Sequence, residues 1–239
     1  MRRTHQIKTS YLLLMVASLT ALPGRLDART DASTPKAPAE RKALEPSEAL
    51  NSLKNGNQRF LSGAVRRDGQ GKRDVERLAS GQAPNSIVLS CSDSRVPPEI
   101  VFDQKLGELF AVRSAGESLS PQAIGSIEYG IAKLGVRLIL VLGHSNCGAV
   151  KAAVDTIGGL GAETENLDRL VQDIQPRIRA ALKGKNGSEN LIVESWANAR
   201  GAAKELSARS KLISEAVQSG KVKVSVGLYD LTNGQVTFE

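Results

Sequence analysis

Two short apolar runs, each followed directly by a polar cluster, constrain the fold of this chain more than any other feature. Ser86–Ser90 reads SIVLS and Val136–Leu142 reads VRLILVL. Short runs rich in Val, Ile and Leu predict strands buried on both faces, as in a parallel sheet covered by helices. A helix is predicted between the two runs, over about residues 121–134, because Ser120 is a good N-cap and Pro121 suits the first helical turn.

The rest of the chain continues this alternation of strands and helices. Helices are predicted over residues 47–62, with Ser47 as the N-cap, and over residues 74–80, and Leu109–Val112 predicts a second strand. Later segments predict helices over 147–157, 166–182, 188–207 and 209–219, and a strand over Val222–Leu231 that turns at Asn233-Gly234 into Val236–Phe238. The expected fold class is α/β, with a mainly parallel central sheet flanked by helices and an antiparallel edge strand at the C-terminus.

The beginning of the chain has the pattern of an export signal. Three basic residues precede the apolar stretch Tyr11–Leu22, which is too short to cross a bilayer and suits a signal peptide. We expect residues 1–28 to be removed after Ala28 and the protein to be periplasmic or otherwise exported, so that it meets the membrane only through this segment; an uncleaved membrane anchor is the alternative. Residues 29–45 are polar and predict a flexible linker, which leaves residues 46–239 as one domain.

The basic composition of the chain does not indicate a nucleic-acid partner. The formal charge is +7, but residues 1–30 contribute five Lys or Arg against one Asp, so the charge without them is +3. The dense basic patch formed by Arg66-Arg67 and Lys72-Arg73 has no aromatic side chains beside it for base stacking. We therefore expect a solvated loop there and no nucleic acid bound.

Soft metal ligands follow the two apolar strands, at the edge where ligands bind in open α/β sheets. Cys91 comes directly after the first strand, and His144 and Cys147 come directly after the second. The chain has only two Cys and two His, and His5 lies in the predicted signal. Zinc accepts thiolate and imidazole in tetrahedral geometry, and three protein ligands with one exchangeable position are typical of a catalytic site. We therefore expect one zinc ion (Zn2+) per chain, bound by these three residues.

Asp93 and Arg95 follow closely after Cys91 and form a candidate catalytic dyad. Arg95 can hold Asp93 in a bidentate ion pair, which keeps the carboxylate off the metal and leaves the fourth position to water. Asp93 then accepts a hydrogen bond from that water and orients it. Two alternatives remain open: a structural zinc closed by Asp93 as its fourth ligand, and, in an exported protein, a disulfide between Cys91 and Cys147.

Two motifs, CSDSRV at residues 91–96 and GHSNCGAV at residues 143–150, resemble those of the β-class carbonic anhydrases. The resemblance extends over about residues 46–239 through GNQRF at 56–60, FDQKLGELFAVRSAG at 102–116, SIEYGIAKLGV at 126–136 and GLYDLTNGQV at 227–236. It implies the zinc ligands and the dyad named above, and the reversible hydration of carbon dioxide to bicarbonate and a proton by zinc-bound hydroxide. It also implies a homodimer or a dimer of dimers. A few members of this fold hydrolyse carbon disulfide or carbonyl sulfide instead, which is the alternative function.

The resemblance also implies a substrate pocket. Gln82, Phe110 and Tyr129 match positions that line the pocket in the plant-like subgroup, often across a dimer interface. The other subgroup has a Trp shortly before the first Cys ligand, whereas the one Trp of this chain is Trp196, so the resemblance is to the plant-like subgroup. The family usually has Arg-Asn-Ala-Gly-Asn where this chain has RSAGE at residues 113–117, and we expect the surroundings of the site to differ there.

Overall fold

The computed structural model describes residues 43–159, 161–182 and 187–239. The predicted signal segment, residues 1–28, and most of the predicted linker therefore lie outside the described residues. All described residues belong to one unit, Pro35–Glu239. In these described ranges, no helix is both long enough and apolar enough to cross a bilayer.

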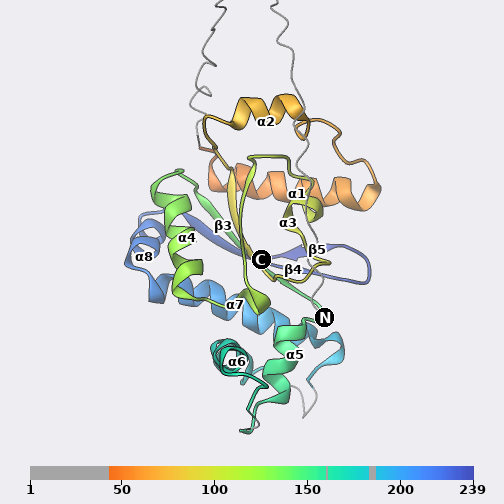
Figure 1. The fold of residues 1–239 in the computed structure, drawn as a ribbon, viewed down its shortest axis with the longest axis vertical. Helices are drawn as coiled ribbons and strands as arrows, with labels where there is room; N and C mark the ends of the chain where they lie inside the picture. Colours follow the sequence, from red (N-terminus) through yellow and green to blue (C-terminus); the bar gives the residue numbers. More distant parts are fainter. Residues whose placement is uncertain (1–42, 160, 183–186) are drawn as a thin grey trace, which may run out of the picture. The chain divides into compact units, whose positions relative to one another are not determined.

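Five strands form one sheet in the order β2-β1-β3-β4-β5 (Figure 1). The strands are β1 (Ser86–Ser90), β2 (Leu109–Arg113), β3 (Leu138–His144), β4 (Lys223–Tyr229) and β5 (Val236–Phe238). β1 pairs in parallel with β2 and β3, β3 pairs in parallel with β4, and β5 adds to β4 in the antiparallel direction. The predicted α/β fold class and its antiparallel C-terminal edge strand are confirmed.

Helices cover both faces of the sheet because the side chains of each strand alternate between them. The helices are α1 (Pro46–Ser62), α2 (Lys72–Leu78), α3 (Pro98–Val101), α4 (Pro121–Ala132), α5 (Gly148–Asp155), α6 (Glu165–Ile178), α7 (Ile192–Arg209) and α8 (Lys211–Gln218), with single 3-10 turns at Ala115–Glu117 and Glu189–Leu191. Ile87 and Leu89 of β1 pack in one core with residues of α4, α7 and α8, whereas Val88 packs in a second core with residues of α1 and α3. These two helix layers lie on opposite sides of the sheet in Figure 1.

A third apolar cluster lies beyond the carboxyl ends of β1 and β3. It joins α5 and α6, and it includes the two cysteines Cys91 and Cys147 together with Val150 and Ile174. The predicted zinc ligands are therefore buried under a pair of helices, which restricts the access of water to them.

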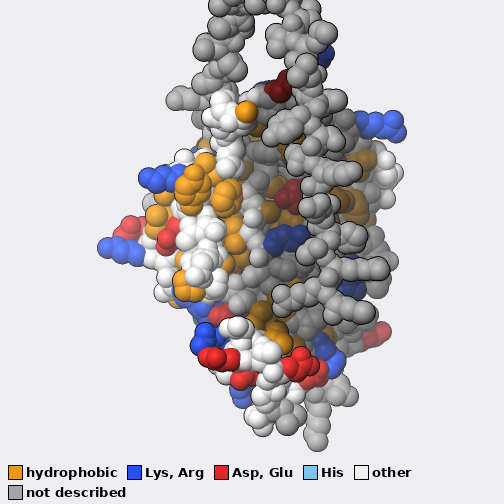
Figure 2. Space-filling model, viewed as in Figure 1, with side chains coloured by type: hydrophobic (Ala, Val, Ile, Leu, Met, Phe, Trp, Pro, Cys, Tyr) orange, Lys and Arg blue, Asp and Glu red, His pale blue; other side chains and the backbone are white. Residues whose placement is uncertain are grey.

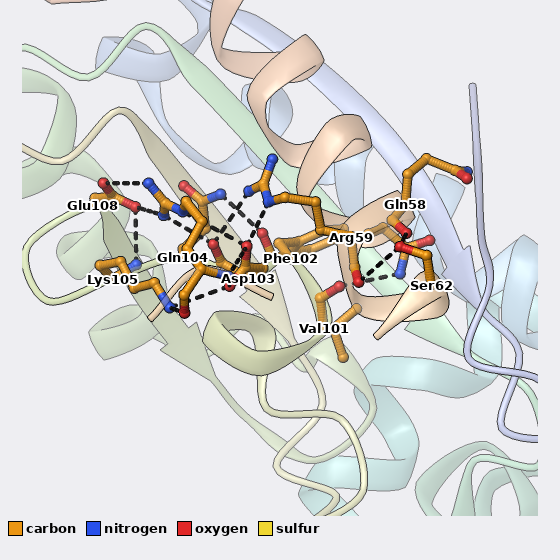
Figure 3. Close-up of polar contacts among 11 residues, drawn as sticks. Gln58, Arg59, Ser62, Val101, Phe102, Asp103, Gln104, Lys105 and Glu108 are labelled. Atoms are coloured by element: carbon orange, nitrogen blue, oxygen red, sulfur yellow. Dashed lines mark hydrogen bonds and ion pairs between the residues drawn. The ribbon is translucent and has the colours of Figure 1, made fainter. Parts of the chain in front are cut away.

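Helix α1 is fixed to the segment before β2 by a close backbone approach and by an ionic cluster, and Figure 3 shows the polar contacts of that cluster. A Cβ atom at Gly56 would lie 1.7 Å from the carbonyl oxygen of Phe102, so glycine is required at this contact. The buried carboxylate of Asp103 accepts a hydrogen bond from Arg59 Nε at 2.5 Å and pairs with Lys105 Nζ at 3.2 Å. Because Asp103 is buried, its carboxylate needs these positively charged partners, and its pairing with Arg59 links α1 to the segment before β2.

Some predicted boundaries are wrong by a few residues. The N-cap of α1 is Glu45 and not Ser47. The backbone N–H of Glu45 donates a hydrogen bond to Glu48 Oε2 at 3.0 Å, which is part of a capping box. Helix α7 begins at Ile192, later than the predicted residue 188, because Asn190 and Leu191 have left-handed φ angles of 51° and 52°. The sequence did not predict α3, because a helix of four residues has too few positions to show a period.

Candidate metal centre

Three predicted ligands meet where two neighbouring strands end. Ser90, the last residue of β1, pairs with Leu142 of β3, so Cys91 lies beside the end of β3 that holds His144. Cys147 is the N-cap of α5. One ligand atom from each of Cys91, His144 and Cys147 lies within 4.8 Å of the others, and all three residues are buried. The structure thus brings together the residues that the sequence pattern selected.

The imidazole of His144 presents a bare nitrogen to this cluster. Its Nδ1 lies 2.9 Å from the carbonyl oxygen of Ser145. Because a carbonyl can only accept, Nδ1 carries the proton and Nε2 keeps its lone pair. Nε2 is buried and has no hydrogen-bond partner among the described residues. A buried imidazole with a free nitrogen, beside two sulfur atoms, has the donor chemistry of a zinc ligand.

The two thiols lie close together, and they are not joined. Their Sγ atoms lie 4.0 Å apart, and both cysteines are free, which excludes a disulfide in this structure. The hydrogen bond with Cys147, supported by His144 and by the backbone N–H groups of Gly116 and Asp93, lowers the pKa of Cys91. The same hydrogen bond, together with burial, raises the pKa of Cys147. One negative charge is therefore favoured on the sulfur pair, and a divalent cation would stabilise a second one.

The dyad has the geometry that the sequence predicts. Arg95 Nε lies 2.9 Å from Asp93 Oδ1 and Arg95 Nη2 lies 2.7 Å from Asp93 Oδ2, and the Arg95 backbone N–H also donates to Oδ1 at 2.9 Å. Asp93 Oδ2 is 3.9 Å from His144 Nε2. The hydrogen bonds from Arg95 hold the pKa of Asp93 well below its usual range. An ionised carboxylate therefore faces the cluster and is held by Arg95.

The three predicted pocket residues lie elsewhere within one chain. Phe110 is near the start of β2, where it pairs with Ile87, whereas Cys91 follows the opposite end of β1. The ring of Tyr129, which is 50% exposed on α4, stacks on Phe110 with centroids 6.2 Å apart. Gln82 is exposed in the loop before β1. The structure therefore separates these residues from the zinc ligands of the same chain, and their role as pocket residues stays a prediction.

Two residues of the RSAGE stretch contact the site and were not predicted to do so. The Arg113 guanidinium donates to the carbonyl oxygens of Cys91 at 3.1 Å and of Asp93 at 2.7 Å, so it holds the loop that carries both residues. The Gly116 backbone N–H donates to Cys91 Sγ at 3.3 Å. The departure of this stretch from the family motif was visible in the sequence, but its contact with Cys91 depends on how β1 and β2 pair.

Comparison with known proteins agrees with this geometry. The family model described as carbonic anhydrase matches residues 86–236. A carbonic anhydrase of Mycolicibacterium smegmatis is 36% identical over 193 residues, which cover 80% of this chain and 92% of that protein. Carbonic anhydrase 2 of Mycobacterium tuberculosis is 35% identical over 190 residues, which cover 80% of this chain and 91% of that protein.

Solved structures with a similar fold are also carbonic anhydrases. Among solved structures, one of two tetrameric β-carbonic anhydrases from Sordaria macrospora matches with a TM-score of 0.59 at 23% identity, over 80% of this chain and 94% of that one. The chain therefore belongs to the carbonic anhydrase family, whose members are lyases, and its fold is that of the β class.

Proposed function

We propose that this protein hydrates carbon dioxide reversibly to bicarbonate and a proton, with one zinc ion per chain held by Cys91, His144 and Cys147. The observation that carries the proposal is the buried His144 ring, which has one ring nitrogen within 4.8 Å of two free cysteine sulfur atoms and a buried Nε2 with no hydrogen-bond partner among the described residues. Two sulfurs and one nitrogen fit zinc, and three protein ligands leave one coordination position for chemistry. When bound, zinc supplies a Lewis acid that makes water a nucleophile at moderate pH.

The side chains beside the zinc ligands have distinct tasks in this proposal. Asp93 is ionised and, because Arg95 holds both of its oxygens, it cannot swing onto the metal. Asp93 Oδ2 remains able to accept a second hydrogen bond and so to orient a proton next to His144 Nε2. Arg113 fixes the backbone of the same loop. These residues position the loop and orient the reacting groups.

Carbon dioxide is favoured over related small substrates. The relatives described above are named carbonic anhydrases, which supports carbon dioxide as the substrate over carbon disulfide or carbonyl sulfide. Assays with all three compounds on one preparation distinguish the two functions.

We also propose that the protein works as a homodimer or a dimer of dimers. β2 is an edge strand of the sheet, and the Phe110–Tyr129 ring pair lies beside it with Tyr129 half exposed. Figure 2 shows hydrophobic side chains on the surface over α4, the helix that carries Tyr129. Gln82, Phe110 and Tyr129 lie away from the zinc ligands of their own chain. In an oligomer, they would line the site of a neighbouring chain. The Sordaria relatives are tetrameric.

The proposal is tested by metal analysis and a stopped-flow hydration assay on the full chain. We expect one zinc ion per chain and carbon dioxide hydration, with both lost in Cys91→Ala, His144→Ala and Cys147→Ala. Ser225→Ala is the control, because Ser225 is buried on β4 and has no side-chain hydrogen bond among the described residues; it should keep zinc and activity. A metal-free protein with a Cys91–Cys147 disulfide that is fully active would refute the proposal.

A further inference from the structure

The turn that contacts Cys91 has an unfavourable backbone. In the 3-10 turn Ala115–Glu117, Gly116 has a φ of 61° and Glu117 a φ of 51°. A left-handed conformation is uncommon for a residue with a side chain. A Cβ atom at Gly116 would also lie 2.6 Å from Ile174 Cδ1 and 2.9 Å from Ala149 Cβ. The turn thus brings the Gly116 N–H against Cys91 Sγ at an energetic cost, and other contacts must hold it there.

Asn198 of α7 supplies those contacts. Its Nδ2 donates to the Gly116 carbonyl oxygen at 2.8 Å and to Glu117 Oε2 at 2.9 Å, and its Oδ1 accepts from Arg177 Nη1 at 3.3 Å. Arg177 offers only donors, so the amide oxygen must face Arg177 and the NH₂ group must face the turn. Both Asn198 and Glu117 are buried, at 0% and 1% exposure.

Burial of the Glu117 carboxyl group at this position is energetically unfavourable. Its Oε1 has no hydrogen-bond partner among the described residues. The charge of Arg177 is already matched by ion pairs with Asp173 at 2.7 Å and Glu205 at 2.9 Å. Burial, followed by the nearby Cys91 charge, raises the pKa of Glu117 well above its ordinary value. A buried carboxyl group with this little compensation destabilises the fold, which points to a role at the adjacent metal centre.

We propose that Glu117 and Asn198 are positioning residues of the metal centre, which hold the Gly116 N–H on Cys91 Sγ and so set how firmly the Cys91 thiolate binds zinc. This inference rests on the proposed zinc function. A backbone N–H donated to a ligand sulfur fixes the direction of the sulfur lone pairs and moderates its charge. Contacts of this kind to ligand atoms typically change metal affinity by about 10–100-fold.

The test is the zinc dissociation constant of the full chain, measured by competition with a chromophoric chelator. Asn198→Ala should raise this constant by about 10–100-fold. Asn57→Ala is a matched control: Asn57 is also a buried amide with three hydrogen bonds, to Val101 O at 3.1 Å, Gly234 O at 3.0 Å and Val236 N at 2.9 Å. It should destabilise the fold and leave the zinc dissociation constant unchanged.

Variants of Glu117 separate positioning from folding. Glu117→Met removes the acceptor for Asn198 at similar size, so it should weaken zinc binding while the free energy of unfolding of the metal-free protein stays equal or rises. Glu117→Gln keeps an acceptor and should restore wild-type affinity. The sulfur-to-metal charge-transfer band of the cobalt-substituted protein should shift in Glu117→Met and not in Asn57→Ala.

The outcomes distinguish failure of the positioning role from failure of the proposed zinc function. If wild type binds zinc and the Asn198 and Glu117 variants bind it equally well, the positioning role is overturned while the proposed function stands. If wild type takes up no zinc, the proposed function fails and this inference fails with it. If Asn198→Ala does not fold, the affinity of Glu117→Met decides.

Discussion

The guanidinium of Arg95 binds both carboxylate oxygens of Asp93, with Nε 2.9 Å from Oδ1 and Nη2 2.7 Å from Oδ2. This planar, two-bond contact fixes the direction of the carboxylate as well as its charge. Because Asp93 Oδ2 is only 3.9 Å from the bare nitrogen of His144, a small rotation of a released carboxylate would bring it onto a metal held by that nitrogen.

Arg95→Ala and Asp93→Asn should both slow turnover, but for different reasons. Asp93→Asn should keep zinc and lose the orienting acceptor, whereas Arg95→Ala should free Asp93 to become a fourth protein ligand. We expect each change to lower kcat by roughly 10²–10⁴-fold. X-ray absorption spectroscopy of the zinc-loaded variants should show an additional protein oxygen ligand in Arg95→Ala only.

A second exposed ion pair provides the control for this prediction. Arg200 binds both oxygens of Glu239, with Nε 2.8 Å from Oε2, far along the chain from the zinc ligands. Arg200→Ala should leave turnover unchanged, because an exposed pair contributes little to stability. Near-normal turnover in Arg95→Ala, with no new protein ligand, would show that Asp93 does not need Arg95.

The cluster around Asp103 should make stability depend on pH. Burial raises the pKa of Asp103, but hydrogen bonds from Arg59, the Arg66 backbone and Lys105 outweigh it, so the pKa is lowered on folding. A carboxyl with a lowered pKa stabilises the fold above its unfolded pKa of about 3.9 and loses that contribution as the pH falls through the lowered value. Asp103→Asn should therefore cost about 1–3 kcal/mol at pH 7, and the difference from wild type should shrink below about pH 4.

Urea unfolding at several pH values measures this effect. Asp155→Asn is a suitable comparison, since Asp155 forms an exposed pair with Lys151 at 2.7 Å and should change stability little at any pH. An Asp103→Asn deficit of the same size at pH 3 and pH 7 would contradict the electrostatic account.

Mixed oligomers can test whether the pocket is shared between chains. Cys91→Ala chains should lack zinc, and Tyr129→Ala chains should have an impaired pocket. If Tyr129 serves the neighbouring chain, a mixed dimer has one site with intact ligands from one chain and Tyr129 from the other. Because one of its two sites is intact, each mixed dimer should then have about half of the activity of a wild-type dimer, measured by stopped-flow hydration.

A mixture of two variants that both lack a zinc ligand is the control for this experiment. Cys91→Ala mixed with His144→Ala should restore nothing, because both substitutions remove zinc ligands that act within one chain. Absence of recovery in the first mixture, with mixed dimers shown to form, would place Tyr129 in the site of its own chain or outside any site.

We propose that the protein is exported and cleaved near Ala28, on the strength of the apolar stretch Tyr11–Leu22 behind three basic residues. N-terminal sequencing of the protein from its native host should begin between about residues 24 and 32. Replacing Leu13 and Leu14 by Arg should keep the chain in the cytosol at full length. A protein in the cytosol that starts at Met1 without any substitution would exclude export.

The fold class and the grouping of the three zinc-ligand residues follow from local sequence patterns. The segments SIVLS and VRLILVL consist mostly of Val, Ile and Leu, and a parallel sheet aligns the carboxyl ends of its strands, so Cys91 and His144 are expected at one edge. Asp93 and Arg95 are two residues apart in one loop. Their ion pair is therefore a local contact, which can be predicted from the sequence.

The surroundings of these three residues depend on contacts between segments far apart in the chain. The Asn198–Glu117 hydrogen bond joins residues 81 positions apart, and it depends on how α7 packs against β3 and the turn Ala115–Glu117, which no local pattern specifies. The same holds for the separation of Phe110 from the zinc ligands, which follows from the register that pairs Phe110 with Ile87, at the opposite end of β1 from Cys91. Periodicity specifies which face of an element is buried, whereas the partners that meet there are selected by the packing of the whole domain.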